Sequence, residues 1–309
     1  MREETLFSIK TPYREEVNVK GFFFGSGKKT TCFVGSLRGN EIQQMYIASQ
    51  LIKKLGELES KGLLVPNHEF LVIPCINSFS MNIGKRFWPV DNTDINRMFP
   101  GYNLGETTQR IAAAVFEHIR GYRYGIQFAS FYLAGDFIPH VRLMHTAFQN
   151  PELAKDFGMP FVLCREPTPI DTTTLNYNWQ VFETDAYSIY TRETDSIDDN
   201  SAKIAIDAVL RFLNKNRFIK YNTFGGCKSQ IIKEKDMISV CSPCGGIFRR
   251  LFNPGDEVKK GDVLALIYHP LNGEEKAKIL APEDGIIFFS HKSPTVTQHQ
   301  LCFFIQNRF

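Results

Sequence analysis

The sequence predicts an α/β domain over residues 1–222, in which helices flank a sheet, followed by a small all-β module over residues 223–309. In the first part, short apolar runs rich in β-branched residues alternate with longer segments of helical spacing. Beyond Gly225-Gly226, short apolar runs are separated by Gly, Pro and Asp, and the helical period disappears. A chain of 309 residues with 43% hydrophobic composition is long enough to bury a substantial core.

The predicted elements of the first domain follow one another as strand, loop and helix. Strand-like runs lie at residues 30–34, 70–74 and 126–129, and helical spacing lies at residues 41–55, 107–119 and 201–214. The last of these segments is amphipathic, because Ile204, Ala208 and Phe212 fall on one helical face. This helix is expected to close the domain.

The composition narrows the classes of partner. The chain carries 36 basic and 33 acidic residues in a mixed order, for a formal net charge of +3. Without a basic tail or stripe in the sequence, we expect a small molecule or a protein as partner, and neither nucleic acid nor a membrane. The N-terminus lacks the apolar stretch of a signal peptide, and no run reaches the roughly 18 apolar residues of a membrane span, which predicts a cytoplasmic protein.

The cysteines favour reduced thiols. There are seven, an odd number, and they are scattered along the chain. Only Cys241 and Cys244 have CxxC spacing, and a structural zinc site would need a second pair of ligands. We expect these two residues to pack within the β-module.

Arginine and asparagine side chains gather after the second predicted strand. This region contains Asn77, Arg86 and, within Asp94–Gly101, Asn96 and Arg97. A guanidinium offers a fixed fork of donors that fits a carboxylate, and a second guanidinium beside a carbonyl stabilises a developing oxyanion. These residue types predict a site for an anionic ligand.

Together with Arg38–Glu41 in the loop after the first strand, these motifs resemble the succinylglutamate desuccinylase and aspartoacylase family, relatives of zinc carboxypeptidases. The resemblance covers nearly the whole chain. It implies a zinc carboxypeptidase-like mixed sheet flanked by helices, and zinc-dependent hydrolysis of the amide bond of an N-acyl amino acid.

The resemblance also implies roles for individual residues. Asn77, Asn96 and Arg97 are expected to bind the substrate, and Arg86 is expected to polarise the scissile carbonyl. The general base of the family is a Glu at the end of a late strand, which Glu193 matches here.

The chain departs from the family at two zinc ligands. Arg38 stands where the first signature has a ligand histidine, and Ala129 stands where the third signature has another. Gln127 replaces the acidic residue of that third signature. Only Glu41 remains of the three expected ligands, and a zinc hydrolase needs three protein ligands to hold the ion and leave a position for water.

We therefore predict a metal-free protein without a bound cofactor. Its pocket would contain the cations of Arg38, Arg86 and Arg97, which would bind a small anionic ligand resembling an N-acyl amino acid. Arg38 would fill part of the volume and charge that zinc occupies in the family. Hydrolysis would be absent or would use altered chemistry.

Alternatives stay open. A relocated metal site would combine Glu41 with Asp136, His140 and His145, although the i, i+5 spacing of the two histidines does not place them on one helical face. A non-catalytic regulatory or scaffold subunit is another possibility, with a second copy or an intact paralogue as its partner. The sequence places no histidine beside Cys75 or Cys164, which argues against a cysteine nucleophile.

The C-terminal module contains an internal sequence repeat. Ser242–Phe248 is similar to Ala281–Phe288, and a pair of such half-units resembles the barrel-sandwich of biotinyl and lipoyl domains. Lys276 lies in the wrong register for a carrier lysine of those domains, so we interpret it as a solvated hairpin residue. The module is expected to serve packing, oligomer contacts or covering of the active-site mouth.

Overall fold

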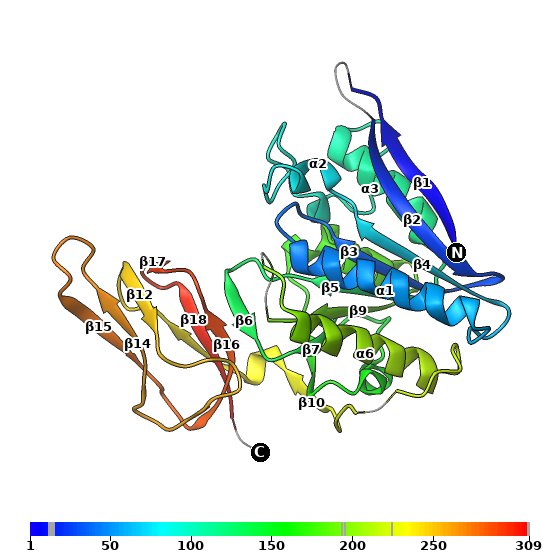
Figure 1. Cartoon of the computed structure of the whole chain (residues 1–309). Coiled ribbons are helices and arrows are strands. Elements are labelled where there is room, and N and C mark those ends of the chain that lie inside the picture. The colour runs from blue at the N-terminus through cyan, green and yellow to red at the C-terminus, as the bar shows by residue number, and fades with distance from the viewer. Residues whose placement is uncertain (12–15, 193, 195, 224, 308–309) are drawn as a thin grey trace. The chain divides into compact units, whose positions relative to one another are not determined.

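The chain folds into two compact units. Figure 1 shows the computed structural model, which describes residues 1–11, 16–192, 194, 196–223 and 225–307. The first unit consists of Met1–Ser130, Pro139–Tyr190 and Thr194–Ile231. The second is built mainly from residues after Ile231 and also contains Phe131–Ile138. A short segment from the middle of the sequence therefore belongs to the C-terminal unit.

A mixed sheet of nine strands, counted within the described residues, forms the centre of the first unit in the order β1-β2-β4-β3-β5-β9-β7-β8-β10. The strands are β1 (Arg2–Ile9), β2 (Val17–Gly25), β3 (Lys28–Ser36), β4 (His68–Cys75), β5 (Tyr124–Ala129), β7 (His140–Met144), β8 (Phe161–Arg165), β9 (Asp185–Tyr190) and β10 (Gln230–Lys233). Strands β4, β3, β5 and β9 run parallel, whereas β1, β2 and β7 pair antiparallel with neighbours. This sheet confirms the predicted mixed α/β class.

Helices cover both faces of this sheet. They are α1 (Ile42–Ser60), α2 (Ser78–Met81), α3 (Thr107–Ile119), α4 (Pro151–Ala154), α5 (Leu175–Val181) and α6 (Asp199–Lys215), with 3-10 turns η1 (Ile95–Arg97), η2 (Lys155–Phe157) and η3 (Pro169–Thr173). Helices α1 and α6 pack into one apolar core, and α3 and α5 pack into the other. In β3, Phe33 belongs to the first core and Val34 to the second, because successive strand residues point to opposite faces.

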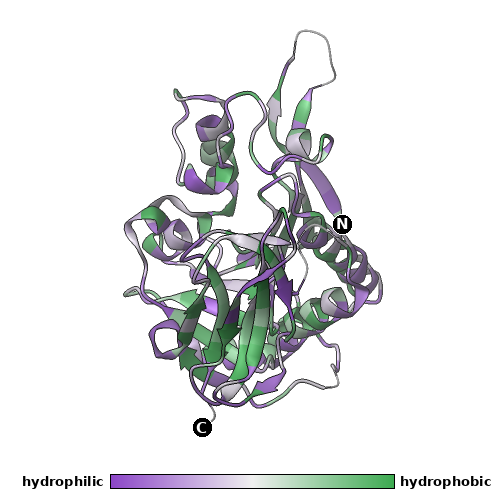
Figure 2. Cartoon of the chain, turned by 90° about the vertical axis from the view of Figure 1, so that its left-hand side faces the viewer, coloured by the Kyte–Doolittle hydropathy of each residue, from purple (hydrophilic) through white to green (hydrophobic). Residues whose placement is uncertain are grey.

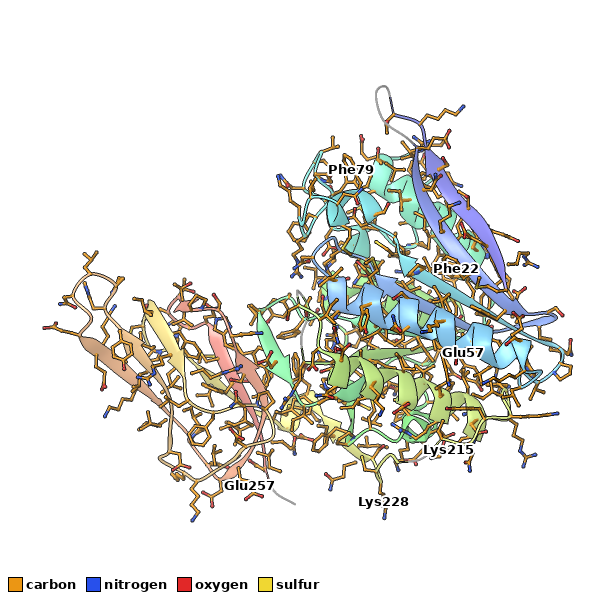
Figure 3. All side chains as sticks on the ribbon, in the orientation of Figure 1. Phe22, Glu57, Phe79, Lys215, Lys228 and Glu257 are labelled. Carbon is orange, nitrogen blue, oxygen red and sulfur yellow. The ribbon has the colours of Figure 1, made fainter. Side chains whose placement is uncertain are left out.

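Side chains labelled in Figure 3 follow this division. Phe22 packs against the core under α1 and α6, whereas Phe79 packs against the core under α3 and α5. Charged residues such as Glu57 on α1 and Lys215 on α6 keep their side chains partly exposed and form ion pairs with neighbouring charges. The amphipathic pattern predicted for α6 and the helical spacing predicted for α1 thus pack these helices on the sheet.

The six predicted elements are confirmed. The three strand-like runs lie in β3, β4 and β5, and the three helical segments lie in α1, α3 and α6. The sequence did not predict the N-terminal hairpin of β1 and β2, nor the antiparallel strand β7. No helix in the described part of the chain combines the length and the apolar character needed to cross a membrane.

The second unit is all-β apart from one turn, η4 (Glu234–Asp236), as the sequence predicts. Its strands are β6 (Gly135–Phe137), β11 (Ile238–Cys241), β12 (Gly246–Arg250), β13 (Glu257–Val258), β14 (Val263–Tyr268), β15 (Glu275–Leu280), β16 (Gly285–His291), β17 (Thr295–Val296) and β18 (Leu301–Gln306). They form the antiparallel orders β11-β18-β16-β13, with β6 beside β16, and β15-β14-β12-β17. Most of the strands in the foreground of Figure 2 are coloured as hydrophobic, and inward residues such as Phe303 and Ile267 form one shared core.

Candidate functional site

The loop between β3 and α1 places Arg38 beside two carboxylates. Its Nη1 atom donates to Glu41 Oε1 at 2.9 Å, and its Nε and Nη2 atoms donate to Asp94 Oδ2 at 3.0 and 2.9 Å. Arg38 is only 5% exposed. Burial alone would lower its pKa, but the carboxylates of Glu41 and Asp94 outweigh burial and raise the pKa above its ordinary value. The guanidinium is therefore a permanent internal cation.

Close packing of the backbone holds this loop. Gly39 donates its backbone N–H to the carbonyl of Arg86 at 3.1 Å. A Cβ atom added to Gly39 would lie 2.2 Å from the carbonyl oxygen of Lys85 and 2.4 Å from the carbonyl carbon of Ser80. Only glycine allows these segments to approach so closely, and this approach brings Arg86 next to the Arg38 loop.

Glu41 is saturated with hydrogen-bond donors. Oε2 accepts from the backbone N–H groups of Leu37 and Arg38 at 2.8 and 3.1 Å. Oε1 accepts from the Arg38 guanidinium and from the hydroxyl of Ser130. An ionised carboxylate offers about four lone-pair sites, so these four donors fill the group. Glu41 is 1% exposed.

Arg86 forms no ion pair within the described part of the chain. Burial lowers its pKa from the ordinary value, and the positive charges of Arg38 and Arg97 act in the same direction. Glu41 and Asp94 act in the opposite direction, but among the residues that the structure describes no carboxylate forms an ion pair with Arg86. The half-buried Arg86 therefore lies among several charges without being neutralised by direct contact.

The motif Asp94–Gly101 is braced by later segments of the chain. Asn96, predicted to bind substrate, accepts from the backbone N–H of Leu175 at 3.1 Å through its Oδ1 atom. Arg97 donates through Nη1 to the carbonyl of Ile170 at 2.6 Å and lies 3.8 Å from Asp171 Oδ1. Arg97 keeps 27% of its side chain exposed.

Three residues of this site were not predicted from the sequence: Asp94 as the partner of Arg38, and Asp171 and Arg165 beside Arg97. Thr168 and Asp171 form a reciprocal capping box at the start of η3. The spacing Thr-x-x-Asp was the signal that could have found this turn. Its contact with Arg97 spans 74 positions of sequence, and no local pattern encodes such a contact.

Asn77 has a structural contact that differs from its predicted role. Its Oδ1 atom accepts from the backbone N–H of Ser80 at 3.2 Å and caps α2. The side chain is 1% exposed. Its contact with a ligand stays a prediction, since its acceptor is used by the fold.

The strand end at Ala129 lies next to Glu41. Gln44, one turn into α1, donates to the carbonyl of Ala129 at 3.2 Å, and the neighbouring Ser130 donates its hydroxyl to Glu41. Gln127 accepts from Asn176 Nδ2 at 2.9 Å, so it belongs to a neutral buried network. The structure thus brings residues 38 and 129, the two positions expected to depart from the family motif, to one place.

The residues of the relocated metal site have other contacts. Asp136 pairs with Arg250 at 2.7 Å, His140 stacks on Tyr190 with ring centroids 5.1 Å apart, and the exposed His145 contacts Glu166 at 2.9 Å. The described residues contain no group of three or more His, Cys, Asp or Glu side chains placed to hold a metal ion. The relocated site gains no support from this part of the chain.

Glu193, the predicted general base, lies outside the described residues. Strand β9 ends at Tyr190, three positions earlier, so the predicted strand end is close to the observed one. The two cysteines weighed as nucleophiles are partly buried. Burial raises the pKa of the Cys75 thiol to about 12, which keeps it protonated and unreactive at neutral pH.

A sequence model of the succinylglutamate desuccinylase/aspartoacylase catalytic domain matches residues 28–215. The chain belongs to this family. The matched range includes Arg38, Glu41, Arg86, Arg97 and Ala129. No curated protein matches the chain closely enough to count as a relative.

Solved structures share the fold over nearly the whole length. A succinylglutamate desuccinylase from Silicibacter sp. TM1040 is 17% identical, with a TM-score of 0.81 over 97% of this chain and 91% of its own. The product-bound ectoine utilization protein from Ruegeria pomeroyi is 18% identical, with a TM-score of 0.80 over 95% and 90%. An aspartoacylase family protein from Mesorhizobium loti is 21% identical, with a TM-score of 0.75 over 96% and 91%.

Proposed function

We propose that this member of the family works without zinc and binds a small anionic ligand that resembles an N-acyl amino acid, with hydrolysis absent or altered. The observation that carries the proposal is the set of bonds made by Arg38. A guanidinium, held by both Glu41 and Asp94, stands at the position to which the resemblance assigns a metal ligand.

The donor set does not fit the family's zinc. Zinc in a hydrolase needs three nitrogen, sulfur or carboxylate ligands at about 2.0–2.3 Å. Ala129 has no donor atom, Arg38 carries a positive charge, and the four donors on Glu41 would have to be displaced. A cation entering beside Arg38 would also be repelled by it, since both are positive.

The ligand class follows from the cations that stay available. Arg86 has no ion-pair partner among the described residues, and Arg97 keeps part of its side chain exposed. The positive charge of Arg97 acts on Arg86, and each guanidinium can bind an anionic group. In this proposal Arg86 and Arg97 bind the acidic end of the ligand, whereas Arg38 supports the pocket from inside.

Metal content tests the first part of the proposal. Protein purified without chelator and without a nickel column should contain well below one equivalent of zinc by mass spectrometry. Near-stoichiometric zinc that is lost in Glu41→Ala would overturn the metal-free reading. As a positive control, the doubly substituted Arg38→His, Ala129→His protein should gain zinc binding, because it restores two nitrogen donors next to Glu41.

Calorimetry with N-acyl derivatives of acidic amino acids tests the second part. Arg97→Ala and Arg86→Ala should each weaken binding by about 10-fold to 100-fold, since a hydrogen bond to a charged group contributes about 1.5–3 kcal/mol. Arg120→Ala is the matched control, because Arg120 is an exposed arginine whose ion-pair partner is Glu117 on α3. Equal affinity in the two pocket variants and the control would count against the inherited carboxylate site.

We further propose that the second unit is a barrel-sandwich of the biotinyl and lipoyl type that carries no attached group. Its two antiparallel sheets around one core support this assignment. The only lysine considered as a carrier, Lys276, donates through Nζ to the carbonyl of Gly245 at 2.7 Å. Intact mass spectrometry of the purified protein should show the unmodified chain, and an added biotinyl or lipoyl mass would contradict the proposal.

A further inference from the structure

We infer that Asp171 and Arg165 form a neutral pair that fixes the direction of Arg97 and leaves the charge of Arg97 to the ligand. The inference rests on the proposed function, because it concerns the same anionic ligand. It assigns positioning residues that lie outside the motif Asp94–Gly101.

Asp171 is a rigid anchor. Arg165 holds it with a two-pronged contact, Nη2 to Oδ1 at 2.6 Å and Nη1 to Oδ2 at 2.9 Å. Thr168 adds its backbone N–H at 2.8 Å and its hydroxyl at 2.6 Å, both to Oδ2. Asp171 is 5% exposed. A carboxylate held by four donors in a capping box has little freedom to rotate.

Arg97 is oriented by this anchor. Its Nη1 atom lies 2.6 Å from the carbonyl oxygen of Ile170 and 3.8 Å from Asp171 Oδ1. The Ile170 carbonyl is fixed because η3 begins with the capping box of Thr168 and Asp171. One edge of the guanidinium is thus turned toward η3, and its remaining N–H groups are left for a ligand.

Charge explains why two residues are needed. Asp171 alone would orient Arg97 but would also neutralise it, and a neutral pair binds an anion poorly. The Arg165 contacts are much shorter than the Arg97 contact, so Arg165 takes up the charge of Asp171. The three residues carry a net charge of +1, and the excess charge belongs to Arg97, the more exposed of the two arginines.

The same segment braces the motif at further points. Phe99 donates its backbone N–H to the carbonyl of Thr173 at 3.0 Å, and Asn178 donates its side-chain amide to the carbonyl of Phe99 at 3.1 Å. Residues 165–178 therefore form the support on which the motif rests, and Asp171 is the charged member of that support.

A ligand-independent experiment tests the orientation. Phenylglyoxal modifies accessible guanidiniums, and peptide mass spectrometry reports the rate at Arg97. Asp171→Asn should make Arg97 react faster, because its nearest carboxylate is gone, while the rate at Arg120 should stay unchanged. An unchanged rate at Arg97 would overturn the inference whether or not the protein binds the proposed ligand.

A double-mutant cycle tests the link to binding, with an N-acyl derivative of an acidic amino acid as the probe. Asp171→Asn and Arg165→Gln should each weaken binding by about 10-fold, in line with one charged hydrogen bond. Each should have less than about a twofold effect when Arg97 is already alanine, because coupled residues are not additive. Thr168→Val, which removes one bond to Asp171, is a milder variant if Arg165→Gln does not fold.

Additive losses in that cycle would overturn the positioning role, since they are the signature of a general structural effect. Failure of the proposed function gives a different result, in which the unsubstituted protein binds none of the probes. The phenylglyoxal rates then still decide the orientation of Arg97.

Discussion

Replacing Arg38 by methionine is the perturbation that most directly probes the contacts of Arg38 with Glu41 and Asp94. Methionine keeps an unbranched chain of similar length but removes the cation. Glu41 would then lose one of its four donors, and Asp94 would lose two of the three donors that contact it. Two negative charges would remain beside each other in a buried place.

The magnitude follows from these losses. Removing one partner of a buried ion pair destabilises a protein by about 3–5 kcal/mol, because the remaining charge stays buried. Glu41 keeps three donors, which reduces its share, and the Asp94 side chain is 15% exposed, so water can partly replace its lost bonds. We expect the free energy of unfolding to fall by about 3–5 kcal/mol, a large part of the 5–15 kcal/mol of an ordinary protein.

Urea unfolding followed by tryptophan fluorescence measures this change. Both tryptophans, Trp88 and Trp179, lie in the first unit and are at most 5% exposed, so their signal reports on the unit that contains Arg38. Arg120→Met is the matched control, because Arg120 and its partner Glu117 have side chains more than half exposed. Such a surface pair contributes about 0–1 kcal/mol.

An Arg38→Met protein that unfolds within about 1 kcal/mol of the unsubstituted chain, with the same dependence on urea, would refute the reasoning. It would mean that Glu41 and Asp94 do not need the guanidinium. The free energy of unfolding of Arg38→Lys should lie between those of Arg38→Met and the unsubstituted chain. Lysine keeps the charge but lacks the planar fork that reaches both carboxylates.

Three further predictions concern backbone, thiol and charge. Gly39→Ala should destabilise the first unit in the same urea assay, because the added Cβ would lie 2.2 Å from a backbone oxygen. At Gly56, within α1, an added Cβ would meet nothing closer than 3.9 Å. Gly56→Ala should therefore stabilise the first unit by about 0.5–1 kcal/mol. Iodoacetamide at pH 7.5 should label the exposed Cys227 and spare Cys75, whose pKa burial raises to about 12; labelling of Cys75 first, by peptide mass spectrometry, would contradict this. Burial would raise the pKa of Asp171, but bonds from Arg165 and Thr168 outweigh it and lower the pKa to about 2, below the ordinary 3.8. Stability from this charge is therefore present above pH 4 and lost as pH falls toward 2, so the difference between the unsubstituted protein and Asp171→Asn should shrink in that window, and a constant difference would argue against the charge.

Local sequence patterns predicted many of the helices and strands. The apolar periods of α1, α3 and α6 and the β-rich runs of β3, β4 and β5 predicted those elements, because each element must present one apolar face to a core. The hairpin of β1 and β2 was not predicted, and neither was the antiparallel direction of β7. Strand direction depends on where the chain returns to the sheet, and β7 returns only after β6 has paired with β16 in the other unit.

In the candidate site, too, some features could be predicted from local sequence and others could not. The motif residues Arg86, Asn96 and Arg97 were readable because the motif itself is local. The carboxylate that holds Arg38 was part of that motif, yet its pairing depends on a contact across 56 positions of sequence. Asp171 lies still farther from the residue it orients.

The sequence by itself determined the family and the identities of the motif residues, Arg38 and Ala129 among them. These are properties of residue identity and short spacing, and folding does not change them. Only the tertiary structure decided that Arg38 is buried between Glu41 and Asp94, that Glu41 has no free acceptor site, and that Arg86 forms no ion pair with a described residue. The physical reason is that electrostatic pairing depends on distances of a few ångströms between groups that the chain brings together from far apart.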